Sequence, residues 1–212
     1  METTKSLPNL SAEEQRILGA LIEKSRTTPD YYPMTLNSLT AACNQKSARN
    51  PVVNYDEETV TLTLNQLKIK GLISTATGGS SRATKYKHNL AIVYPIIPSE
   101  LAIISLLLLR GPLTPGEINS NSGRLYEFES IEEVLEQLQK LATDEPAFVK
   151  QLPKKPGQKE ARFIHLLGDY VEHTEEIPAL VATPQHDLEE RIVKLEQEVE
   201  ELKELVNLLM DK

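Results

Sequence analysis

A repeated order of short segments within the first 168 residues restricts the fold more than any other feature of this chain. Each copy opens with apolar residues at helical spacing, first around Ile17 and again around Ile103. A short second helix follows, which Thr35 can cap in the first copy and Thr114 in the second. A longer third helix and two strands complete each copy, so the sequence predicts an internal duplication.

Local signals mark the helix ends and the strands of the first copy. Ser11 and Glu14 have the spacing of a capping box, and Asp56 can cap the third helix. Residues 72–77 and 83–90 are the two candidate strands, and the sequence GGSSR between them suits a hairpin connection. Three helices followed by a β-hairpin predict a winged helix.

The second copy ends in the same way. Ser130 can cap its third helix, and the strand candidates AFVKQL and ARFIHLL flank the loop PKKPGQKE. We therefore expect an α+β, mostly helical fold with two tandem winged-helix domains followed by a C-terminal coiled-coil helix. The expected boundaries are 10–95 and 96–168 for the domains, 169–186 for an acidic linker that contains prolines, and 187–211 for the coiled-coil helix.

Heptad spacing predicts the coiled coil. With Leu188 at position d, branched residues occupy a and leucines occupy d, a combination that favours a parallel two-stranded coil. The core positions are then Ile192, Leu195, Val199, Leu202, Val206 and Leu209. We expect a homodimer through this segment. A single amphipathic helix that folds back onto its own domains is the alternative, because about three heptads is short for a coiled coil.

The negative charge is concentrated at the C-terminus. The net charge is −8, but residues 1–95 carry 11 Lys/Arg against 8 Asp/Glu, whereas residues 169–212 carry 4 against 13. The acidic average therefore does not exclude a polyanionic partner for the first part of the chain. No apolar run is long enough to cross a bilayer, no secretory signal begins the chain, and a single cysteine cannot build a disulfide framework. We expect a cytoplasmic protein with no membrane contact.

Three blocks of sequence carry a resemblance to a known family. They are LIEKSRTTPDYYPMTLNSLTAACNQKSARNPV, SSRATKYKHNL and LLLLRGPLTPGEINSNSGRLYEF. With these blocks the chain resembles the YceH-like family of bacterial proteins over roughly residues 10–168. The resemblance implies a tandem winged-helix fold and a bacterial source. It implies no reaction, ligand or accepted site residues.

No sequence motif points to an enzyme. We find no phosphate-binding glycine loop that opens a helix, no nucleophile elbow and no helical histidine pair with metal-ligand spacing. Cys43 lies in the apolar register of the second helix, where we expect a buried structural thiol. We therefore expect no catalytic residues, no metal and no cofactor.

Two groups of cations are candidates for nucleic-acid contact. A wing of this fold can reach the DNA backbone or the minor groove. In the first domain the candidates lie on the wing, at Arg82, Lys85 and Lys87, and in the long connector before the third helix, at Lys46 and Arg49. We expect all five to face the same side. In the second domain the candidates are the wing residues Lys154, Lys155 and Lys159. For both groups, a solvated surface without a nucleic-acid contact is the alternative.

The third helices argue against insertion into a DNA groove. At 100° per residue, Leu62 and Ile69 lie opposite the buried stripe of the first domain's third helix, so we expect another surface to cover them. The outer face of the second domain's third helix carries Glu132, Glu133 and Glu136, which would repel phosphates. The leading interpretation is a non-enzymatic dimeric regulator that touches DNA mainly through the first domain. The alternative is a protein-binding scaffold that uses the faces of the third helices.

Overall fold

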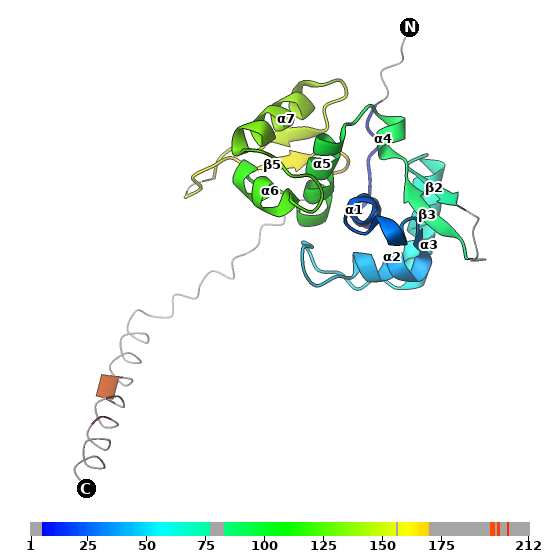
Figure 1. Ribbon diagram of the computed structural model, residues 1–212, viewed down its shortest axis with the longest axis horizontal. Helices are drawn as coiled ribbons and strands as arrows, with labels where there is room; N and C mark the ends of the chain where they lie inside the picture. The colour runs from blue at the N-terminus through cyan, green and yellow to red at the C-terminus, as the bar shows by residue number, and fades with distance from the viewer. Residues whose placement is uncertain are drawn as a thin grey trace. The chain divides into compact units, whose positions relative to one another are not determined.

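The computed structural model describes residues 6–76, 83–155 and 157–169, together with residues 196, 197, 199 and 203. Met1–Tyr170 form one compact unit and Val171–Lys212 a second, and Figure 1 shows the helices and strands of the first. The four described residues of the second unit are helical. The rest of the predicted coiled coil, and the linker beyond residue 169, lie outside the described residues.

Two sets of helices and strands follow one another along the first unit. The first set is α1 (Ala12–Thr27), the 3₁₀ turn η1 (Pro29–Tyr31), β1 (Met34–Thr35), α2 (Leu36–Cys43), α3 (Glu57–Ile69), β2 (Ile73–Ala76), β3 (Lys85–His88) and the single turn α4 (Leu90–Val93). The second set is α5 (Pro98–Arg110), α6 (Pro115–Ser122), α7 (Ile131–Thr143), β4 (Val149–Gln151) and β5 (Phe163–His165). Helices account for about half of the described residues.

The predicted helix caps are present. The Ser11 hydroxyl accepts from the Glu14 amide while the Glu14 carboxylate accepts from the Ser11 amide, which completes the capping box of α1. Thr114 and Glu117 form the same capping box at α6, whereas the Asp56 and Ser130 side chains cap α3 and α7 by accepting from one backbone amide each. These contacts satisfy backbone N–H groups that would otherwise lack partners at each helix start.

Both sheets are small and antiparallel. In the first set the strand order is β1-β3-β2, with Met34 opposite Tyr86 and Ser74 opposite Lys87. In the second set β4 pairs with β5, and an isolated bridge joins Leu113 to Phe163. The chain is therefore an α+β protein, and the order of elements in each set is consistent with a winged-helix-like fold.

Helices α1 and α5 pack directly against each other and lie side by side in Figure 1. Gly19 makes this close approach possible, because a Cβ atom there would lie 2.9 Å from Leu109 Cγ. The Ser105 hydroxyl donates across the contact to the Gly19 carbonyl at 3.3 Å. One continuous cluster of buried apolar side chains therefore runs through both sets of elements.

An equivalent ion pair, with a buried carboxylate and a partly exposed ammonium, occurs in both sets. Glu14 in the first turn of α1 contacts Lys70 at the end of α3, with 2.6 Å between Oε2 and Nζ. Glu100 in the first turn of α5 contacts Lys140 in the last turn of α7, also at 2.6 Å. Each pair ties the start of one helix to the end of another, where a carboxylate and an ammonium also complement the helix dipoles. This correspondence is independent of the apolar pattern that predicts the duplication.

Candidate functional site

The long connector between α2 and α3 is fastened at its ends by Asn44. The Asn44 side chain donates to the Tyr55 carbonyl and accepts from the Tyr55 amide, both at 2.8 Å. This paired contact mimics a backbone ladder and closes the connector into a loop. Asn44 therefore anchors the connector through both ends of its side-chain amide.

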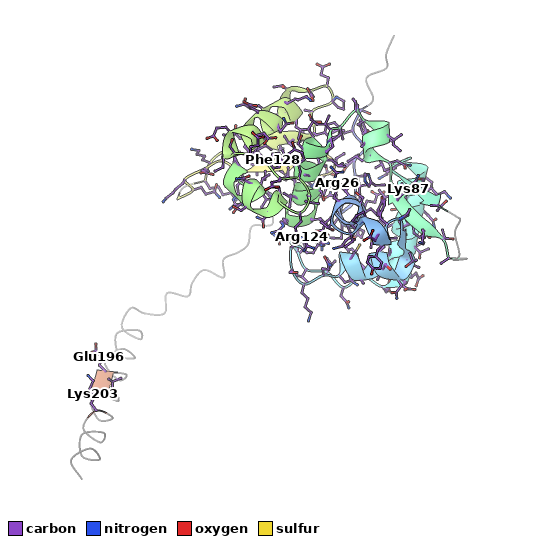
Figure 2. The ribbon with its side chains drawn as sticks, viewed as in Figure 1. Arg26, Lys87, Arg124, Phe128, Glu196 and Lys203 are labelled. Carbon is purple, nitrogen blue, oxygen red and sulfur yellow. The ribbon has the colours of Figure 1, made fainter. Side chains whose placement is uncertain are left out.

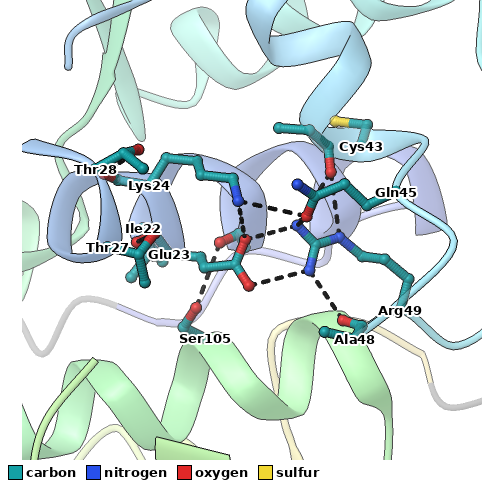
Figure 3. Close-up of polar contacts among 12 residues, drawn as sticks. Ile22, Glu23, Lys24, Thr27, Thr28, Cys43, Gln45, Ala48, Arg49 and Ser105 are labelled. Atoms are coloured by element: carbon teal, nitrogen blue, oxygen red, sulfur yellow. Dashed lines mark hydrogen bonds and ion pairs between the residues drawn. The ribbon is translucent and has the colours of Figure 1, made fainter. Parts of the chain in front are cut away.

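Arg49, in the middle of the connector, points inward. Only 6% of the residue is exposed, and its guanidinium forms a fork with Glu23 of α1, with Nη2 2.6 Å from Oε2 and Nη1 3.1 Å from Oε1. It also donates to the Ala42 carbonyl and to the Gln45 side chain (Figure 3). The expectation that Arg49 belongs to a nucleic-acid surface is wrong, because every donor group of this cation is directed into the protein.

The Glu23 carboxylate responds to this environment. Burial alone would raise the pKa of Glu23, but the hydrogen bonds and charge of Arg49, with a smaller effect of Lys24, leave that pKa lowered. The Lys24 ammonium lies 3.1 Å from the same carboxylate. Glu23 is therefore ionised at neutral pH and holds the connector through charge-assisted hydrogen bonds.

A second arginine and a backbone contact complete the attachment of the connector. Arg16 of α1 donates to the Cys43 carbonyl at 3.2 Å and to the Pro51 carbonyl at 2.5 Å. The Asn50 amide donates to the Leu109 carbonyl of α5 at 2.8 Å. The connector thus braces α1 against α5, which explains why a polar, basic stretch of this length is ordered.

Two titratable side chains, Cys43 and His165, are deeply buried. The Cys43 thiol is buried, which raises its pKa to about 12 and removes its nucleophilic form at neutral pH. Burial also lowers the pKa of His165 to about 4. Within the described part of the chain, no group of His, Cys, Asp and Glu side chains could hold a metal ion. No described helix has the length and apolarity to cross a membrane.

Lys85 and Lys87 are two residues apart in β3, and Tyr86 between them packs against the core, so both lysines lie on the outward face of the three-stranded sheet. Figure 2 labels Lys87. The two lysines stand opposite Ala76 and Ser74 across the β2–β3 ladder, whereas His88 lies on the other face, within 3.3 Å of the Ser25 hydroxyl in α1. Lys87 is exposed and Lys85 is partly exposed. Arg82 lies in residues 77–82, outside the described ranges. Lys46 is exposed on the connector, but its predicted neighbour Arg49 is not.

The outer surface of α3 is partly apolar. Val60, Leu64 and Leu67 are buried, whereas Leu62 is 59% exposed and Ile69 is 87% exposed. Lys68 beside Ile69 is also exposed. We call Leu62, Ile69 and the residues between them on this side the α3 outer face. The second set of elements does not cover it, so the covering expected from the sequence is not seen within the described residues.

An apolar groove runs along α7. It has a volume of about 490 Å³ and lies between α7, the first residue of α6 and the β4–β5 hairpin. We call it the α7 groove; its lining residues are Pro115, Ile131, Leu135, Gln139, Ala142, Thr143, Gln151, Lys154, Glu160, Ala161 and Phe163. Glu132 and Glu136 are exposed on the same helix, whereas Glu133 accepts from the Glu129 amide at 2.8 Å.

The lysines of the second hairpin are exposed but partly engaged. The Lys154 ammonium donates to the Lys159 carbonyl at 3.2 Å, and the Lys155 amide donates to the Gln158 side chain. These contacts close the loop between β4 and β5. They are compatible with a solvated turn as well as with a phosphate-binding wing.

Sequence comparison supports the resemblance noted above. Residues 10–158 match the family described as "Protein of unknown function, DUF480". The chain belongs to this family. It is 44% identical over 218 residues to a UPF0502 protein of Shewanella woodyi, with 96% of this chain and all of that protein covered. A UPF0502 protein of Solibacter usitatus is 47% identical over 195 residues, with 92% of this chain and 93% of that protein covered.

In this DUF480 protein, the buried residues of α3 and α7 occupy equivalent positions, but the side of each helix next to these residues differs in polarity. The buried residues Val60 and Leu64 of α3 match Val134 and Leu138 of α7. On that alignment, the α7 residues that line the groove match four polar residues of α3, Glu57, Thr61, Asn65 and Lys68, and one apolar residue at its end, Ile69. The sequence reasoning missed the groove, although the spacing of Ile131, Leu135 and Ala142 on one side of a helix was visible.

Proposed function

We propose that this protein is a non-enzymatic, dimeric regulator with two tandem winged-helix domains, residues 10–95 and 96–168, and that it contacts DNA mainly through the first. The observation that carries the proposal is the pair Lys85 and Lys87 on the outward face of the sheet. Arg82 precedes them by three residues in the sequence. Among the described residues neither lysine has an ion-pair partner. Lys46 is available as a further cation, whereas Arg49 is not part of the surface.

In this proposal the lysines contact DNA phosphates, and no helix enters the major groove. The first turn of α3 carries Glu57 and Glu58, which would repel phosphates, and its outer face carries the exposed apolar side chains Leu62 and Ile69. Both features disfavour entry of this helix into the major groove. Lysines on a hairpin neutralise phosphates without sequence readout. The proposed binding is therefore weakly sequence-dependent and strongly salt-dependent.

Dimerisation through residues 187–211 is part of the proposal. Within the described tail residues the chain is helical, and Val199 is 48% exposed there. An apolar residue on an otherwise charged helix gains burial when two chains pair at their a and d positions. A dimer also places two first domains on one duplex, which strengthens binding by raising the effective concentration of the second contact.

A salt titration tests the DNA contact. Binding of the full chain to random-sequence duplex DNA is measured at several salt concentrations, and the slope of log K against log [salt] is determined. We expect Lys85→Ala with Lys87→Ala to flatten this slope by about one unit per lost phosphate contact. Lys150→Ala, an exposed lysine on β4, is the matched control and should leave the slope unchanged. An unaltered slope in the double variant refutes the proposed surface.

The scaffold function is the second candidate, and the α7 groove favours it. A groove lined mainly by apolar side chains does not bind phosphates, whereas it can bind the apolar side of a helix from a protein. The two candidates differ in one measurement. If the full chain has no measurable affinity for DNA at low salt, the scaffold function replaces the DNA-contacting one.

A further inference from the structure

The α7 groove has the dimensions of a helix-binding surface. Its α7 wall extends from Ile131 to Thr143, which is about 18 Å of helix at 1.5 Å per residue. Leu135 and Ala142 line this wall, and Phe163 lines the opposite side from β5. A surface of this kind accepts the apolar stripe of a helix with side chains at intervals of three, four or seven residues.

The chain itself carries a matching stripe. Leu62 and Ile69 on the α3 outer face are seven residues apart, or about 10.5 Å along the helix axis. Both are well exposed, and Asn65 and Gln66 between them are also exposed. A pair of large apolar side chains on a regular helix is a compact, rigid surface, and it fits within the length of the α7 groove.

The charges beside the two surfaces are complementary. Lys68 is exposed next to Ile69, near the C-terminal end of α3. Glu132 and Glu136 are exposed beside the groove, in the N-terminal half of α7. If α3 of one molecule lies antiparallel to the α7 groove of another, Lys68 comes next to Glu132 and Leu62 lies at about the height of Gln139. This arrangement also sets the C-terminal end of one helix dipole against the N-terminal end of the other.

We infer that the α7 groove binds the α3 outer face of a second copy of this chain. Each copy carries one such face and one such groove. If two copies exchange both contacts around a two-fold axis, they form a closed pair. The α3 outer face and the sheet lysines are separate surfaces, so this self-association extends beyond the proposed DNA contact and does not depend on it.

Disulfide trapping in the full chain tests the inference. A chain with Leu62→Cys and a chain with Gln139→Cys, carrying tags of different size, are co-expressed and mildly oxidised. Only contact between two copies can join these two cysteines, and the buried Cys43 thiol, whose pKa is raised to about 12, does not compete. We expect the mixed disulfide to form at least about tenfold faster than with Leu62→Cys and Lys150→Cys, because effective concentration favours pre-positioned partners. Lys150 is exposed and does not line the groove.

A charge swap provides the second arm. Lys68→Glu in the first chain should slow trapping about two- to fivefold, and Glu132→Lys in the second chain should restore it, as expected for one exposed ion pair. If the mixed disulfide forms no faster than with the Lys150 control, the inference is overturned. This is also the result expected if a different protein occupies the groove. A charge swap without rescue overturns the proposed orientation. The salt slope of DNA binding in the uncrosslinked variants reports separately on the proposed function.

Discussion

Replacing Arg49 with alanine should strongly destabilise the folded chain. The Arg49 side chain is fully buried and lies 2.6 Å from Glu23, whose side chain is only 14% exposed. Removal of one member of a buried ion pair leaves the other charge unpaired and typically costs about 3–5 kcal/mol. Lys24 remains 3.1 Å from the same carboxylate, so we expect the lower end of this range, about 3 kcal/mol.

Urea unfolding followed by far-ultraviolet circular dichroism measures this loss. Lys46→Ala is the matched control, because Lys46 is exposed on the same connector and should change the free energy of unfolding by less than about 0.5 kcal/mol. A double-mutant cycle with Glu23→Gln isolates the pairwise term. A loss below about 1 kcal/mol for Arg49→Ala, the value typical of exposed pairs, would refute the bracing role of this residue.

The same ion pair predicts the sign of a pH effect. The pKa of Glu23 in the folded chain is lower than its ordinary value of 4.5. The stabilisation is therefore fully present above pH 4.5 and is lost as the pH falls through the lower folded-state pKa. In the Arg49→Ala chain this acid-induced loss should be smaller, which unfolding curves at several pH values can measure.

Three further outcomes are expected. Burial lowers the pKa of His165 in the folded chain from 6.5 to about 4, so the unfolded chain binds this proton more readily. The free energy of unfolding should therefore fall as the pH is lowered from 6.5 to 4, and His165→Leu should make this fall smaller. Gly19→Ala should lower the free energy of unfolding by about 1–3 kcal/mol in urea melts, because its Cβ meets Leu109 at 2.9 Å. A chain that ends at residue 169 should dimerise about a hundredfold more weakly in sedimentation than the full chain; equal dimerisation would exclude residues 187–211 as the main contact.

Features with local causes could be predicted from the sequence. A cap depends on a side chain and a backbone amide three residues apart, so Ser11 and Asp56 identify the starts of α1 and α3 correctly. The two-residue strand β1 was missed because its pairing with β3 joins Met34 to Tyr86, far along the chain. The tail beyond residue 169 is tested only at its four described residues, and the coiled coil stays a prediction.

The candidate site was predicted less well, for a physical reason. Charged side chains are usually exposed, and nothing within the connector distinguishes Arg49 from Lys46. The difference lies in Glu23, a residue 26 positions away that supplies a carboxylate on the inner side. The position of Leu62 and Ile69 opposite the buried stripe was predicted correctly, because a helical wheel needs only the position of that stripe. The expected covering of both side chains by another surface is not seen in the described part of the chain.

The packing of α1 on α5 joins two helices that hold the same place in the repeated order of elements. Contacts between equivalent surfaces are the signature of two-fold symmetric dimers. A single-copy ancestor could have sheltered its first helix in this way only by pairing with another molecule. Gene fusion would have converted that association from a concentration-dependent equilibrium into a permanent one, leaving the two hairpins free to diverge.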